Sequence, residues 1–346
     1  MSPACANPLA GLNLAALQAY LSSSGFPITG ELTATMITGG RSNLTYRVSD
    51  EVTSWVLRRP PTAGLTPSAH DVGREYRIVH ALQSTKVPVP PTLMTCPDPS
   101  VIGAPFTLVG FVPGRVLRTQ ADLETLSDTE LNSIHRELIR VLAELHAVDY
   151  ASAGLADFGR PSGYADRQIA LWRRQWDRVA TRELPDLDLL YAALQDRPPR
   201  SSGPAGIVHG DFRIDNTLLD PHRVDRMVAL VDWEMSTIGD PVTDVAMMCA
   251  YQHGDFDHVV GEPGASTSGR WPDAAAIAAD YADVSGRDLG DFGAYLGLAF
   301  LKLAVIAEGI SARHHVGVGT GAGYATAGLA VPGLVSAGLA ALAGTG

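Results

Sequence analysis

The stretch IVHGDFRIDNTLL, residues 207–219, holds a histidine, two aspartates, an arginine and an asparagine between two aliphatic runs. A fully buried strand would not contain so many polar groups, because each would need a partner in the dry interior. A solvated loop would not need such apolar flanks. The pattern therefore indicates polar residues mounted on a rigid frame, which is how catalytic groups are usually held.

The spacing within this stretch suggests phosphoryl transfer. Asp211 and Asn216 are five residues apart, and Asp232 follows a predicted hairpin that would return it to their neighbourhood. Two carboxylates and an amide are hard oxygen ligands that suit Mg²⁺, and one aspartate could take a proton from an attacking hydroxyl. With His209, the order is H-x-D followed by asparagine at plus five. The alternatives are a hairpin-entry loop with Asx turns and, for Asp232, a strand-end cap.

The first third of the sequence predicts a small, mostly antiparallel sheet with one helix. Segments rich in threonine, valine and aromatic residues predict strands, and apolar residues at three- and four-residue steps predict a helix over 71–83. The predicted strands cover residues 31–38, 44–49, 53–58, 91–95 and 105–112.

The remainder of the chain predicts helices. Ser127 and Glu130 form a capping-box pattern, residues 164–183 form a helix rich in tryptophan and arginine, and Asp240 with Pro241 resembles a helix start. The expected fold class is α+β with two lobes. The N-lobe, residues 1–110, holds the antiparallel sheet, and the mostly helical C-lobe covers residues 111–346.

Three features of the predicted N-lobe would suit a nucleotide. The GGRSN segment, residues 39–43, could fold backbone N–H groups over phosphates, although a Gly-Gly hairpin turn is an equal alternative. Arg58 on the third predicted strand would supply a cation, and Glu75 on the following helix could pair with it. Taken singly, both could be surface charges.

Composition excludes several classes of function. A formal net charge of −11 gives no basic excess for nucleic acid. Three widely spaced cysteines fit reduced thiols, and no lysine or arginine precedes Arg41 to form a secretory signal. The apolar stretch 295–310 carries Lys302 and Glu308 and predicts a core helix. We expect a cytoplasmic protein, a monomer or homodimer, with no nucleic-acid or membrane partner.

The sequence resembles the aminoglycoside phosphotransferase and choline kinase-like family, and especially the kinase-like domain that precedes some acyl-CoA dehydrogenases. The resemblance spans most of residues 39–246. It is carried by GGRSNLTYRV, SAHDVGREYRIVHAL, LVGFVPGRVL, IVHGDFRIDN and LVDWEMSTIGDPVTDVA. It implies a protein-kinase-like fold and transfer of phosphate from ATP, or from GTP, to a hydroxyl of a small-molecule acceptor.

The resemblance also implies site roles. Asp211 would be the catalytic base, Asn216 and Asp232 would bind Mg²⁺, Asp244 would brace the catalytic loop, and His209 would be structural. The implied nucleotide contacts are Gly39, Gly40, Arg41, Ser42, Asn43, Arg58, Glu75, Leu108, Gly110 and Phe111.

One departure from the family pattern affects the expected activity. The usual strand lysine is Arg58 here, and arginine does not substitute for lysine by default. A catalytically weak or silent nucleotide-binding scaffold is therefore the alternative function. A protein kinase is disfavoured, because Gly210 stands where protein kinases have arginine and no APE motif follows Asp232. The acceptor is predicted to be hydroxyacyl-type, by family analogy, or aminoglycoside-like.

Overall fold

The structure is a computed structural model of the 346-residue chain, and it describes residues 9, 11–37, 43–61, 71–201, 203–318 and 321–344. The chain divides into two compact units. The first comprises Met1–Pro113 and Ala229–Met235, and the second comprises Gly114–Val228 and Ser236–Gly346. The first unit is therefore built from two separate stretches of sequence.

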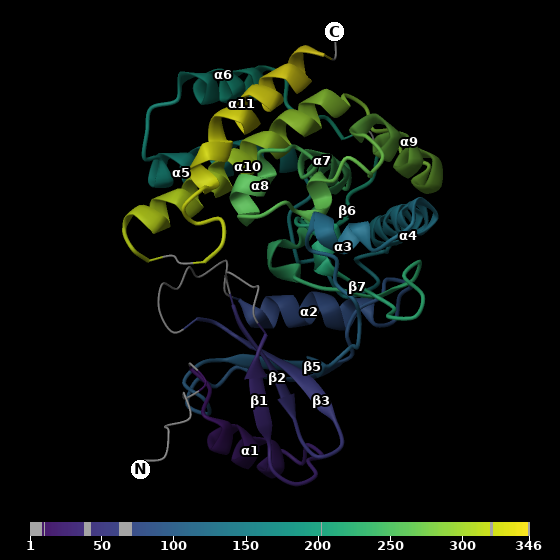
Figure 1. Cartoon of the computed structure of the whole chain (residues 1–346), viewed down its shortest axis with the longest axis vertical. Coiled ribbons are helices and arrows are strands. Elements are labelled where there is room, and N and C mark those ends of the chain that lie inside the picture. The colour runs from purple at the N-terminus through teal and green to yellow at the C-terminus, as the bar shows by residue number, and fades with distance from the viewer. Residues whose placement is uncertain are drawn as a thin grey trace. The chain divides into compact units, whose positions relative to one another are not determined.

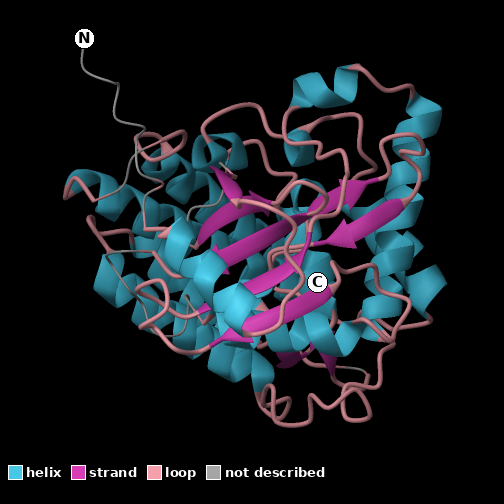
Figure 2. Cartoon of the chain, turned by 90° about the horizontal axis from the view of Figure 1, so that it is seen from below, coloured by secondary structure: helices cyan, strands magenta, loops and turns pink. Residues whose placement is uncertain are grey.

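An antiparallel sheet forms the centre of the first unit (Figure 1). Its strands pair in the order β1-β2-β3-β5-β4, and Figure 2 shows strands running side by side. The turn after β2 is closed by the carboxylate of Asp50, which accepts hydrogen bonds from the backbone N–H groups of Val52 and Thr53. All five strands overlap segments predicted as strands: β1 (Thr33–Met36), β2 (Leu44–Ser49), β3 (Ser54–Arg59), β4 (Thr92–Cys96) and β5 (Phe106–Gly110).

The two faces of this sheet have different partners. Helix α1 (Leu14–Ser23) packs with Tyr46, Leu57 and Leu108 in one apolar cluster. Because side chains alternate along a strand, Arg58 lies on the opposite face, where it contacts α2 (Val72–Leu82). The sequence analysis predicted α2 but not α1. Within helix α1 only Leu17 and Leu21 are buried, which is too short a pattern to predict a helix.

The second stretch of the first unit begins within β8 (Met227–Leu230). The N–H group of Leu230 donates a hydrogen bond of 2.8 Å to the carbonyl of Pro88. The short 3-10 helix η2 (Trp233–Met235) then buries the indole of Trp233, whose N–H donates to the Leu230 carbonyl. These contacts attach Asp232, between β8 and η2, to the first unit.

Helices make up most of the second unit, as the sequence predicted. The capping box at Ser127 and Glu130 is present at the start of α4. One helix within the described ranges, α10, is long and apolar enough to span a membrane, and 83% of that apolar window is buried inside the protein. The helices are α3 (Gln120–Glu124), α4 (Asp128–His146), α5 (Tyr164–Val179), α6 (Pro185–Asp196), α7 (Val242–Ala250), α8 (Phe256–Val260), α9 (Ala274–Ser285), α10 (Phe292–His315) and α11 (Ala327–Ala343).

Two predicted helix boundaries differ from the structure. Helix α5 ends at Val179 and not at residue 183, because the N–H and hydroxyl of Thr181 bind the buried carboxylate of Glu308. Helix α7 begins at Val242, one residue later than predicted. Asp240 still supports that start, since its carboxylate accepts a hydrogen bond from the N–H of Val242.

Two small sheets hold the stretch with which the sequence analysis began. Strand β6 (Gly206–Val208) pairs antiparallel with β9 (Thr237–Gly239). The 3-10 helix η1 (Ile214–Asn216) follows, and β7 (Thr217–Leu219) then pairs with β8. The loop 209–216, which carries the polar residues, therefore connects strands β6 and β7, as its apolar flanks predicted.

Candidate functional site

A buried aspartate holds the backbone at the start of the polar loop. Asp244, on α7, accepts hydrogen bonds from the N–H groups of His209 and Gly210 at 2.7 and 2.8 Å. Burial acts to raise the pKa of Asp244, but its hydrogen bond to His146 and nearby charges lower that pKa below its ordinary value. Gly210 has a φ of 84°, which favours glycine. Asp244 therefore fixes the loop where it leaves β6.

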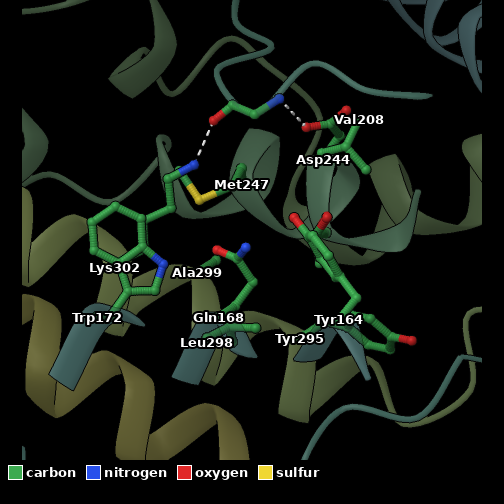
Figure 3. Close-up of a pocket in the computed structure, with 12 residues that line it drawn as sticks. Tyr164, Gln168, Trp172, Val208, Asp244, Met247, Tyr295, Leu298, Ala299 and Lys302 are labelled. Atoms are coloured by element: carbon green, nitrogen blue, oxygen red, sulfur yellow. Dashed lines mark hydrogen bonds between the residues drawn. The ribbon is translucent and has the colours of Figure 1, made fainter. Parts of the chain in front are cut away.

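A buried lysine holds the same loop from a second helix. The Nζ atom of Lys302, on α10, donates a hydrogen bond of 2.5 Å to the carbonyl of Gly210, and Figure 3 draws this bond beside the one to Asp244. Burial lowers the pKa of Lys302, opposed by the charges of Asp211 and Asp244. The head group borders a cavity of about 30 Å³, which is room for roughly one water molecule. The sequence analysis treated Lys302 only as a charge in an apolar helix.

The carboxylate of Asp211 lies at the centre of the loop. Its Oδ2 atom accepts a hydrogen bond of 2.8 Å from the amide of Asn216, which η1 brings back toward Asp211. Its Oδ1 atom accepts a hydrogen bond from the hydroxyl of Tyr251 and lies 3.3 Å from Nε of Arg213. The structure therefore brings together Asp211 and Asn216 as their spacing suggested, and adds Tyr251 and Arg213, to which the sequence analysis gave no role.

A second cluster, in the first unit, centres on Arg58. Its guanidinium lies 2.6 Å from the carboxylate of Glu75, 2.8 Å from that of Asp232 and 3.4 Å from that of Glu234. The pairing of Arg58 with Glu75 that the sequence suggested is present. Glu234 is an addition, although it ends the DWE motif that was visible in the sequence.

The charges in this cluster perturb one another. Burial raises the pKa of Glu75 to about 7, although the positive charge of Arg58 opposes that rise. Burial acts in the opposite sense on Arg58, but the carboxylates of Glu75, Asp232 and Glu234 outweigh it and raise the pKa of Arg58 above its ordinary value. Arg58 is therefore charged at every relevant pH, whereas Glu75 titrates near neutrality.

Asp232 has an unusual backbone conformation. Its φ is 67°, and it is the one residue other than glycine with a positive φ in the ranges that the structure describes. Such a conformation costs about 1–3 kcal/mol and persists where surrounding contacts impose it. The ion pair with Arg58 and the hydrogen bonds of Leu230 and Trp233 supply such contacts.

The predicted nucleotide contacts on β5 divide into two groups. Leu108 packs its side chain in the same apolar cluster as α1 and pairs with both Leu57 and Met94, and its contact with a nucleotide stays a prediction. Gly110 and Phe111 lie beyond this core, and their N–H groups donate to the carbonyls of Pro91 and Ser54. The guanidinium of Arg47 lies 4.3 Å from the centre of the Phe111 ring.

Two valines share the sheet face of Arg58. Val56 and Val109 pair across β3 and β5, and neither is fully buried. They are candidates for apolar contact with a base that the sequence analysis did not name. Of the GGRSN segment, Gly39, Gly40, Arg41 and Ser42 lie outside the described residues, and Asn43 is buried just before β2.

Asn216 in the second unit and Asp232 in the first each carry a side-chain oxygen of the kind that Mg²⁺ binds. The amide nitrogen of Asn216 donates to Asp211, so its oxygen is the atom that could bind a cation, and Asp232 contributes a carboxylate. In the parts of the chain that the structure describes, no group of three or more His, Cys, Asp or Glu side chains could hold a metal ion by itself. One carboxylate and one amide suit Mg²⁺, which usually takes its remaining ligands from water and phosphate.

An antiparallel sheet unit with a cation–glutamate pair, and a helical unit with an H-G-D-x₄-N loop, define a kinase-like phosphotransferase. The chain belongs to the phosphotransferase enzyme family, whose sequence pattern matches residues 33–293. The family membership and the kinase-like two-lobe fold class expected from the sequence are therefore confirmed.

Similar proteins include both longer chains and single domains. The chain is 32% identical over 308 residues to acyl-CoA dehydrogenase family member 11 of Homo sapiens, covering 87% of this chain and 39% of that protein. It thus spans roughly two fifths of that relative's length. A structure described as a putative aminoglycoside phosphotransferase from Ralstonia eutropha has a TM-score of 0.81 and 32% identity, and the match covers 96% of this chain and 99% of that one.

A more distant structure shares the fold alone. A thermostable mutant of aminoglycoside phosphotransferase APH(4)-Ia has a TM-score of 0.63 and 15% identity, over 94% of this chain and 98% of that one.

Proposed function

We propose that this protein transfers a phosphoryl group from ATP, or from GTP, to a hydroxyl of a small molecule, with Asp211 as the catalytic base. The observation that carries the proposal is the arrangement around Asp211. Its carboxylate is oriented by Asn216 and Tyr251, and the backbone before it is held by Asp244 and Lys302. A base held this firmly supports general-base catalysis.

The other clusters would serve the nucleotide. Arg58, oriented by Glu75, would contact phosphate oxygens, and the valine pair at 56 and 109 would contact the base. Asn216 and Asp232 would hold Mg²⁺, which supplies charge neutralisation at the transferring phosphoryl group when bound.

The acceptor class is proposed from the relatives and from the charges. The dehydrogenase-linked relatives favour a hydroxyacyl-type acceptor, which is analogy between families. The basic segment 164–183 gives this little support, because two of its arginines already have acidic partners. Arg173 pairs with Asp177 and Asp188, and Arg182 pairs with Glu308. An aminoglycoside-like acceptor is consistent with the net charge of −11.

One observation favours the second candidate, a nucleotide-binding scaffold with weak or no turnover. Arg58 already pairs with three carboxylates within the first unit, so phosphate must compete with them for the guanidinium. A scaffold would bind the Mg·nucleotide complex without transferring phosphate to any acceptor.

A nucleotide-consumption screen tests the proposal. Purified protein would be incubated with Mg·ATP or Mg·GTP and with aminoglycosides, amino alcohols, sugars and hydroxyacyl thioesters, and products would be detected by mass spectrometry. We expect one acceptor class to gain 80 Da per phosphoryl group, and the Asp211→Asn variant to form that product far more slowly than the wild type. Nucleotide binding without any product across the library would favour the scaffold.

A further inference from the structure

The two oxygens of the Asp211 carboxylate are not equivalent. Oδ1 accepts a hydrogen bond from Tyr251 and lies within 3.3 Å of the charged head group of Arg213. Oδ2 accepts one hydrogen bond, from Asn216 at 2.8 Å. Each carboxylate oxygen offers two lone-pair sites. Oδ1 therefore carries both a hydrogen bond and the ion pair with Arg213, whereas Oδ2 accepts one hydrogen bond and keeps one site for a further proton donor.

Tyr251 is well placed to keep Oδ1 occupied. It directly follows α7, is 3% exposed, and packs with a ring-centre distance of 4.8 Å against Phe256. Burial raises the pKa of its hydroxyl well above the ordinary value, and the charge of Asp211 adds to that rise. The hydroxyl therefore stays protonated and acts as a donor.

Helix α7 and the residue directly after it contact the loop at two points. Asp244 and Tyr251 are seven residues apart, about two helical turns. Asp244 binds the backbone of His209 and Gly210, whereas Tyr251 binds the reacting carboxylate itself. These contacts from α7 and its C-terminal end thus hold both the backbone of the loop and the orientation of the Asp211 carboxylate.

We infer that Tyr251 is a positioning residue for the catalytic base, and that Oδ2 of Asp211 is the atom that takes the proton from the acceptor. The inference rests on the proposed function. In the step, the acceptor's O–H proton passes to Oδ2 as its oxygen bonds to the γ-phosphorus. The bond from that phosphorus to the bridging oxygen breaks, and the nucleoside diphosphate leaves with the electron pair.

The Tyr251→Phe variant tests this role. Without the hydroxyl the carboxylate can rotate, and we expect kcat to fall about tenfold or more, with the KM for nucleotide within about twofold of wild type. The matched control is Tyr295→Phe, which removes a buried hydroxyl that donates to a different carboxylate, that of Asp240, at 2.5 Å. The control should keep its kcat. A Tyr251→Phe kcat within twofold of wild type would overturn the inference.

A double variant separates positioning from a general structural role. If Tyr251 acts through the carboxylate of Asp211, adding Tyr251→Phe to Asp211→Asn should cost no further residual turnover. If the double variant instead loses turnover by the product of the two single-variant factors, that result would count against the inference. Should Tyr251→Phe fail to fold, 3,5-difluorotyrosine at position 251 keeps the shape and strengthens the donor. We then expect kcat to fall about threefold or more, and an unchanged kcat would refute the role.

These results remain distinguishable from a failure of the proposed function. An Asp211→Asn variant that transfers phosphate at a near-normal rate would remove Asp211 as the base, and both proposals would fail together. Loss of transfer in Asp211→Asn with normal turnover in Tyr251→Phe would leave the phosphotransferase standing and reject the positioning role alone.

Discussion

The carboxylate of Glu75 lies 2.6 Å from the guanidinium of Arg58, yet burial raises the pKa of Glu75 to about 7. The attraction of the arginine does not fully offset the loss of water around a carboxylate that is only 11% exposed. This pair is therefore sensitive to pH in the neutral range.

The pH dependence of stability should report this pair. In the unfolded chain Glu75 titrates near 4.5, so the folded state binds the proton more tightly and stability from this group falls as pH rises toward 7 and above. The Glu75→Gln variant lacks that effect. Relative to this variant, the unfolding free energy of the wild type should drop by ~2 kcal/mol between pH 5 and pH 8 in urea titrations. The control is Glu51→Gln, which replaces an exposed glutamate. If the difference in unfolding free energy between the wild type and Glu75→Gln stays constant from pH 5 to pH 8, the raised pKa of Glu75 is contradicted.

Replacing Arg58 should weaken nucleotide binding. Arg58→Ala removes the cation on the sheet face and leaves the buried Glu75 without its partner, so we expect ATP affinity to fall about 10- to 100-fold. Arg58→Lys restores a charge and should recover part of the loss. Isothermal titration calorimetry measures both, and an ATP affinity unchanged in Arg58→Ala would remove this residue from the site.

Asp211→Asn should separate binding from chemistry. The amide keeps the size of the side chain but cannot accept a proton, so transfer should slow by about 10² to 10⁴-fold. Binding of the Mg·nucleotide complex should be retained, as calorimetry would show. Near-normal turnover would require a different base.

Asp232→Ala should abolish the contribution of Mg²⁺ to nucleotide binding. Mutation of a residue that only supports a metal ligand already costs about 10- to 100-fold in metal affinity, so loss of the ligand itself should make titrations with and without Mg²⁺ converge. Asp225→Ala removes an exposed carboxylate from the turn before β8 and serves as the control. A variant of Asp232 with a wild-type response to Mg²⁺ would exclude it as a ligand.

Local patterns predicted most of the fold and part of the site. The strands, α2 and the capping box of α4 follow from periodicity and short-range chemistry, and Asp211 and Asn216 meet because a single turn of η1 separates them. Tyr251 and Lys302 could not be predicted this way, because they reach the loop from 40 and 92 residues along the chain. A strand pattern also does not say which face a helix will cover, so the burial of Leu108 against α1 could not be predicted.

Other expectations were drawn from composition alone. The cytoplasmic location, the monomeric or homodimeric state, and the lack of nucleic-acid or membrane partners stay predictions. So do the roles of residues 39–42 in binding phosphate.

The seven residues 229–235 have a consequence for how this protein can be divided. They belong to the first unit although more than a hundred residues of the second unit precede them in the sequence. They also carry two of the three carboxylates that form ion pairs with Arg58. A fragment ending at Pro113 would keep only Glu75 of these three acids beside the guanidinium of Arg58. It would also lose the hydrogen bond from Leu230 to Pro88. Gene fusions and truncations should therefore keep the chain intact from the first strand of the sheet through η2, because neither unit is encoded by one continuous stretch of sequence.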